Sequence, residues 1–99
     1  MWAQLIQAPL KPGADVTALA AAIKAGEWPD SGLVREVFMH DQNNPDSVYV
    51  LAFFESEEKA RAREQDARRA DGLVQIRAAI GEVLDGPPEF FDLDVVRSG

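Results

Sequence analysis

The sequence contains no cysteine, and it has only one histidine, His40, among its 99 residues. Without cysteine the chain has no disulfides, thiolate nucleophiles or cysteine-ligated zinc, and a small domain without disulfides is typical of the cytoplasm, where we expect it. No basic residue precedes Lys11, so we expect no signal peptide. The longest apolar run, residues 48–54, is far shorter than the about 20 residues that cross a bilayer. We therefore expect no membrane association.

Basic residues are in the minority, with 10 lysines and arginines against 17 aspartates and glutamates, for a net charge of −7. Because an acidic chain repels a phosphate backbone, we expect no nucleic-acid partner. Half of the basic residues gather at residues 59–69, but helical spacing does not bring them into one stripe. Two glutamates precede arginines there by four residues, the favourable order for helical ion pairs: Glu57 with Arg61 and Glu64 with Arg68. This pattern favours a solvated, salt-paired helix face over an anion site.

The length suits a single domain, residues 1–99. Apolar segments bounded by turn residues predict four strands, at residues 2–10, 33–40, 47–54 and 90–96. The turn-forming residues 41–46 predict that the second and third strands form a hairpin.

Two helical regions separate these strands. Asp15 is placed to cap the first helix, and Gly26 to end it. Ser56 is placed to cap the second, which we expect residues 71–72 to interrupt and residues 86–88 to end. The order predicts an α+β, ferredoxin-like β-α-β-β-α-β fold, with a four-stranded antiparallel sheet and its helices on one face.

Both faces of the predicted sheet are apolar, although a sheet with one wet face should alternate. In the third strand, Val48, Val50, Ala52 and Phe54 fill one face, and Tyr49, Leu51 and Phe53 fill the other. In the second strand, alternation places Val34 and Phe38 on one face and Leu33, Val37 and Met39 on the other. Helices cover only one side, and an apolar surface of this size usually marks an interface. Because twofold dimers are the commonest oligomers, we predict a homodimer that packs sheet against sheet.

The chain resembles the dimeric α/β-barrel superfamily and, within it, the antibiotic-biosynthesis-monooxygenase-like group. The segments that carry the resemblance span nearly the whole length: residues 2–6 followed by Lys11-Pro12-Gly13, residues 47–56, and residues 86–90. The resemblance implies a sheet-to-sheet dimer and a pocket between sheet and helices for small, often aromatic or polycyclic, compounds. Some members oxidise such compounds with oxygen and without a bound cofactor, so we expect no cofactor; many have no known activity. Haem-degrading members have a histidine and a tryptophan around the second helix, and residues 56–85 contain neither.

Histidine is the residue type whose side chain ordinarily titrates near neutral pH, which makes His40 the first candidate for chemistry. By alternation it shares a strand face with Glu36 and Phe38. One interpretation is a general base that deprotonates a phenolic or enolic substrate. The other is a half-exposed histidine at the end of a strand, beside a polar turn.

Five further residues are candidates for a ligand pocket: Trp2, Gln4, Arg35, Phe38 and Tyr49. Trp2 and Phe38 have the aromatic character of pocket walls, although Trp2 also suits the sheet core. Gln4 and Tyr49 offer hydrogen bonds to a ligand or to neighbours within the protein. Arg35, if covered, needs either a ligand anion or an acid of the last strand.

Three hypotheses follow. The chain is a cofactor-free monooxygenase or related enzyme with His40 as its base, a small-ligand-binding dimer without chemistry, or a structural dimer. The alanines of the first helix permit close packing on the sheet and favour the third hypothesis. Asp92 and Asp94 lack further metal ligands nearby in the sequence, so we expect no metal. Our working hypothesis is the monooxygenase-like dimer, acting on a small aromatic or polycyclic compound in a pocket between sheet and helices.

Overall fold

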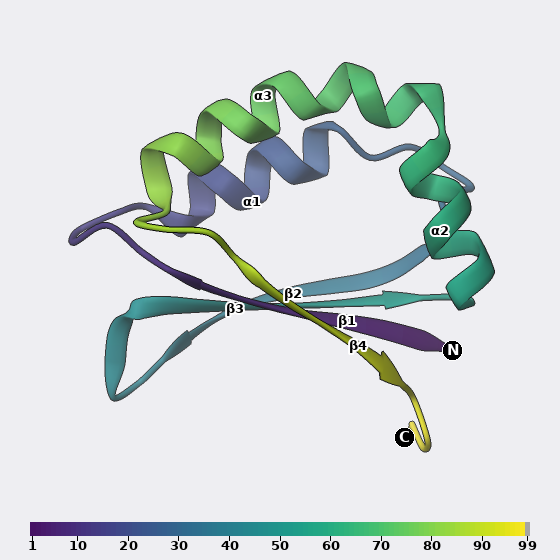
Figure 1. Cartoon of the computed structure of the whole chain (residues 1–99), viewed down its shortest axis with the longest axis horizontal. Coiled ribbons are helices and arrows are strands. Elements are labelled where there is room, and N and C mark those ends of the chain that lie inside the picture. Colours follow the sequence, from purple (N-terminus) through teal and green to yellow (C-terminus); the bar gives the residue numbers. More distant parts are fainter. Residues whose placement is uncertain (99) are drawn as a thin grey trace.

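The computed structural model describes residues 1–98. Its elements are, in chain order, β1 (Trp2–Pro9), α1 (Val16–Ala25), β2 (Leu33–Asp41), β3 (Asn44–Phe54), α2 (Glu57–Gln65), α3 (Ala67–Val83) and β4 (Glu89–Asp94). The strands form one antiparallel sheet in the order β2-β3-β1-β4. In the described chain, the helices lie on one side of this sheet and leave the other side without a helix (Figure 1). The predicted ferredoxin-like arrangement is confirmed.

The predicted helix caps at Asp15 and Ser56 are confirmed. The Asp15 carboxylate accepts a hydrogen bond from the Thr17 backbone N–H at 2.9 Å, and the Ser56 hydroxyl accepts one from Lys59 N–H at 3.1 Å. Each bond satisfies a backbone N–H that lacks a partner in the first turn of its helix.

The predicted interruption of the second helical region at Gly72 is wrong, because α3 runs through this residue. The break lies at Asp66, whose backbone is extended and whose carboxylate caps α3 by accepting from Arg68 N–H at 2.9 Å. Gly72 instead faces Gly26 at the end of α1, where a Cβ added to Gly72 would lie 3.0 Å from the Gly26 Cα. The two glycines thus let α1 and α3 pack closely, which outweighs the low helix propensity of Gly72.

A register shift in β2 corrects the predicted alternation of that strand. Leu33 pairs with Phe54 and Arg35 pairs with Phe53, so Val34 is an extra residue between them. Because the bulge reverses the alternation at this point, Leu33 faces the helices together with Glu36. The hairpin turn is also tighter than predicted, since β2 extends to Asp41 and β3 begins at Asn44.

The hydrophobic core divides into two clusters along the helix-facing side of the sheet. The larger consists of Ala8, Leu10, Val16, Leu19, Val48, Val50, Val83 and Leu84. The smaller consists of Trp2, Ala52, Phe54 and Ala60, under α2. Residues of both clusters line a cavity between the sheet and the helices.

The opposite side of the sheet carries an apolar surface in the single chain. Met39, Phe91 and Leu93 are exposed there by 38%, 42% and 40%. Leu51 and Phe53 of β3 lie between them and are half-buried. Among the described residues, no helix is long and apolar enough to cross a membrane.

Candidate functional site

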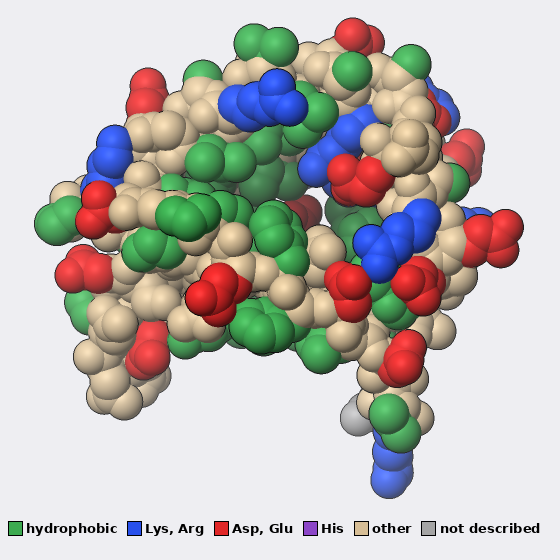
Figure 2. Space-filling view, viewed as in Figure 1, with side chains coloured by type: hydrophobic (Ala, Val, Ile, Leu, Met, Phe, Trp, Pro, Cys, Tyr) green, Lys and Arg blue, Asp and Glu red, His purple; other side chains and the backbone are tan. Residues whose placement is uncertain are grey.

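A cavity of about 310 Å³ lies between the sheet and the helices. Its opening is the hollow in the middle of Figure 2. Most of its wall is apolar and includes Ile6, Val48, Val50 and Phe90 from the strands and Leu19, Ile23, Ile76 and Ile80 from the helices. The volume lies at the lower end of the range for small-molecule pockets, about 300–1,000 Å³.

One part of the cavity wall is polar. Its charged side chains are Glu36 from β2, Arg61, Arg63 and Glu64 from α2, and Arg69 from α3. Arg63 is only 7% exposed. For Arg63 and Arg69, the predicted solvated helix face is therefore wrong.

The break at Asp66 explains why only one of the two predicted helical ion pairs forms. Arg61 lies 3.2 Å from Glu57 within α2, as predicted. Arg68 lies beyond the break and binds Asp66 instead, at 2.8 Å. The break thereby frees Glu64 to contact two other arginines.

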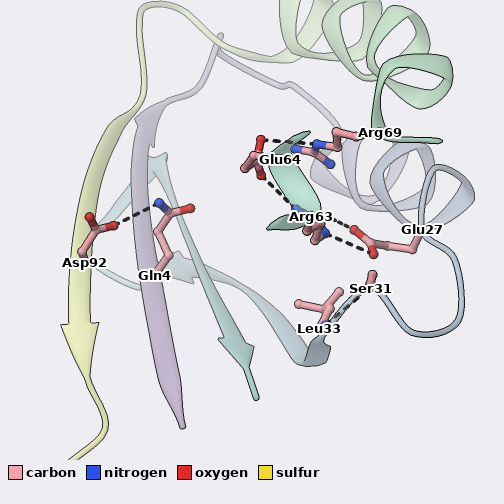
Figure 3. A network of polar contacts seen from close by, with 8 residues as sticks. All are labelled: Gln4, Glu27, Ser31, Leu33, Arg63, Glu64, Arg69 and Asp92. Carbon is pink, nitrogen blue, oxygen red and sulfur yellow. Dashed lines mark hydrogen bonds and ion pairs between the residues drawn. The ribbon is translucent and has the colours of Figure 1, made fainter. Parts of the chain in front are cut away.

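The Arg63 guanidinium donates hydrogen bonds to two carboxylates (Figure 3). It donates through Nε and Nη2 to Glu27, and through Nη1 to Glu64 at 3.1 Å. Glu27, from the loop after α1, is 15% exposed, so this ion pair is largely buried. Burial lowers the pKa of Arg63 to about 10, with a contribution from the like charge of Arg69, while Glu64 favours the charged form. Arg63 therefore remains a cation at neutral pH.

Arg69 has no comparable partner. Its Nε lies 3.7 Å from Glu64 Oε2, beyond hydrogen-bond distance, and is a buried N–H without an acceptor in the described chain. Figure 3 shows Glu64 between Arg63 and Arg69. Arg69 therefore keeps an unused donor beside the cavity, which is a costly state for a buried polar group.

Glu36 is the carboxyl group that the sheet contributes to the cavity. Burial raises the pKa of Glu36, and the charge of Arg69 partly opposes this. Glu36 and Arg69 therefore interact electrostatically, but they form no ion pair within residues 1–98, where Arg69 lies nearer to Glu64. A desolvated carboxyl with a raised pKa is suited to accept a proton.

Of the predicted pocket residues, Trp2 and Gln4 line the cavity. The Trp2 ring packs against Phe54 at 5.8 Å between ring centroids, and the Arg61 guanidinium lies over it at 5.2 Å. Gln4 donates a hydrogen bond from Nε2 to Asp92 Oδ1 at 3.2 Å (Figure 3). Its partner in the structure is therefore a neighbour within the protein, one of the two alternatives left open by the sequence. Both residues are thus held in place at the cavity wall.

The other predicted candidates do not line this cavity. His40 faces the helix side of β2 but is exposed near the hairpin, and Phe38 packs against the larger core cluster. Tyr49 lies on the opposite face of the sheet, where its hydroxyl accepts from Gln7 Nε2 at 3.1 Å. Arg35 lies on that face too and is exposed; within one chain the acids of β4 are at the far edge of the sheet. The roles predicted for these four residues remain predictions.

Sequence reasoning missed Glu36, Arg63 and Arg69 as cavity residues. Glu36 did carry a signal, since it is an acid within an apolar strand and shares a face with Phe38. The two arginines carried none, because nothing in the sequence distinguishes Arg63 from the other basic residues of α2, and the direction of Arg69 depends on the helix break at Asp66.

The sequence matches no protein-family model and no curated protein. Solved structures with a similar fold include a candidate antibiotic biosynthesis monooxygenase from Chloroflexus aurantiacus, with 22% identity, a TM-score of 0.68, and coverage of 100% of this chain and 97% of that one. SnoaB, a cofactor-independent oxygenase from Streptomyces nogalater, matches with 10% identity, a TM-score of 0.68, and coverage of 98% and 94%. A Nitrosomonas europaea protein of unknown function matches with 19% identity, a TM-score of 0.70, and coverage of 99% and 91%.

These likenesses define the class of fold as a ferredoxin-like α+β fold. Several structural neighbours that match nearly the whole chain are described as antibiotic biosynthesis monooxygenases, which confirms the resemblance inferred from the sequence. At these identities the likeness concerns the fold alone, because one fold serves many functions.

Proposed function

We propose that this protein oxidises a small aromatic compound with dioxygen, without a cofactor, in the cavity between sheet and helices. The observation that carries the proposal is a desolvated carboxyl group, Glu36, in a mostly apolar cavity of about 310 Å³. SnoaB, with the same fold, is a cofactor-independent oxygenase. In this proposal Glu36 takes the role that the sequence suggested for His40.

The reaction needs only a base and a site that excludes water. Glu36 removes a proton from an acidic CH₂ carbon activated by a neighbouring carbonyl or phenolic group. The carbanion gives its electron pair to dioxygen as the carbon–oxygen bond forms, and the peroxide anion takes the proton back from Glu36. The hydroperoxide then loses water, so the CH₂ becomes a carbonyl. One oxygen atom ends in the product and the other in water, so no external reductant is required.

The test is oxygen consumption with a panel of phenols and enolisable aromatic ketones. We expect Glu36→Gln to lower turnover by at least about 100-fold while ligand binding persists, because the amide keeps the shape and loses the base. Glu82→Gln, an exposed glutamate of α3, is the matched control and should keep full turnover. Equal turnover in Glu36→Gln contradicts the role of Glu36, and binding without oxygen consumption favours a ligand-binding protein without chemistry.

We also propose that two copies pair through the helix-free face of the sheet, which carries Met39, Phe91 and Leu93. A second copy would cover this apolar surface on both chains at once, as the resemblance implies. Native mass spectrometry tests this proposal, and a stable monomer at micromolar concentration would contradict it.

A further inference from the structure

Arginines outnumber glutamates in the wall of the cavity, although the whole chain is acidic. The chain has a net charge of −7, yet three arginines and two glutamates line the cavity. Whether an anionic ligand is favoured depends on which of the three arginines lacks a close carboxylate partner.

Two of the three arginines are already neutralised by carboxylates. Arg61 contacts Asp92 at 2.9 Å and Glu57 at 3.2 Å at the exposed rim. Arg63 donates three hydrogen bonds, to Glu27 and Glu64. Neither guanidinium needs a ligand.

Arg69 is different. Glu64 gives one carboxylate oxygen to Arg63 and stays 3.7 Å away from Arg69 with the other. The buried Nε–H of Arg69 consequently has no acceptor within residues 1–98. Arg69 also lines the cavity, so an oxygen anion bound there would give its guanidinium a charge-assisted partner at its accessible part.

We infer that the ligand is a flat apolar carboxylic acid whose carboxylate binds Arg69 and whose body lies along Ile6, Val50 and Ile80. This inference rests on the proposed function, since it names the substrate class of the same cavity. A carboxylate fits the planar edge of a guanidinium. A dianion such as a phosphate monoester is disfavoured, because Glu36 and Glu64 share the lining.

The experiment compares three naphthalene probes by isothermal titration calorimetry: 2-naphthoate, its neutral methyl ester, and 2-naphthyl phosphate. We expect 2-naphthoate to bind at least about tenfold more tightly than the ester, as befits one charge-assisted hydrogen bond. Arg69→Gln should abolish this preference while the affinity for the ester stays unchanged, which also shows that the variant is folded. Arg77→Gln, an exposed arginine on α3, is the matched control and should keep the preference.

A second readout follows the Arg69 Nε–H resonance by NMR, which should shift with 2-naphthoate and not with the ester. Equal binding of acid and ester, or an unchanged preference in Arg69→Gln, overturns the carboxylate inference and leaves the proposed function standing. Tightest binding of the phosphate overturns it as well. If none of the probes binds, including the neutral ester, both the inference and the proposed ligand cavity fail.

Discussion

Removal of Glu27 should destabilise the protein strongly, although Glu27 lies in a loop. Its carboxylate is 15% exposed and accepts two hydrogen bonds from Arg63, which is 7% exposed. Glu27→Ala leaves a buried guanidinium with Glu64 as its remaining partner. Breaking a buried ion pair from one side costs about 3–5 kcal/mol, and retention of Glu64 places the expected loss at the lower end.

Urea denaturation measures this loss as a lower midpoint at an unchanged slope. For a chain of this size, about 3 kcal/mol corresponds to a fall in Tm of roughly 12–24 °C. Glu57→Ala is the matched control, because its ion pair with Arg61 is exposed at both ends and should change stability little. If the two alanine variants are equally stable, the buried ion pair does not stabilise the fold and the reasoning is refuted.

Four further outcomes are expected. Gly72→Ala should lower the free energy of unfolding by about 1–3 kcal/mol, because the added Cβ lies 3.0 Å from the Gly26 backbone. Gly81 has open space around it, so Gly81→Ala should raise the free energy of unfolding by up to about 1 kcal/mol. Thermal unfolding of the two variants compares these effects. His40→Ala should keep turnover and ligand affinity, since His40 is exposed outside the cavity; a loss of turnover would restore it as the base. The pKa of Glu36 is higher in the folded than in the unfolded protein. The contribution of Glu36 to the free energy of unfolding is therefore highest below the unfolded pKa and falls as the pH rises through the folded pKa. Glu36→Gln should gain stability relative to the parent over that pH interval, as measured by urea denaturation. Binding of 2-naphthoate should be accompanied by proton uptake, because its negative charge offsets Arg69 and so raises the pKa of Glu36. The other charged residues that face the cavity are Arg61, Arg63 and Glu64. Calorimetry in buffers of different ionisation enthalpy should detect the uptake in the parent and not in Glu36→Gln.

The element order was predictable because local signals and tertiary packing agree over most of the chain. Asp15 and Ser56 cap helices as their side-chain chemistry predicts. The alternation of β3 is also correct, since Val48, Val50, Ala52 and Phe54 are all buried toward the helices. Where a strand has no irregularity, a period of two is sufficient to assign its faces.

The errors occur where packing overrides local preference. Gly72 has poor helix propensity, but its lack of a side chain is what the contact with Gly26 requires. Val34 is an ordinary strand residue, and only the pairing of β2 with β3 reveals that it is a bulge. The second error also affected the candidate site, since the bulge turns Leu33 toward the cavity.

The junction between α2 and α3 determines the chemistry of the cavity. If one helix continued through Asp66, Glu64 and Arg68 would have the spacing of a surface ion pair. Because Asp66 ends α2 and caps α3, Glu64 instead lies between Arg63 and Arg69. Glu64 completes the partners of Arg63 but does not reach hydrogen-bond distance to Arg69, so one buried N–H is left beside Glu36. The sheet and helices provide the apolar space, whereas this junction supplies charges that would select a ligand.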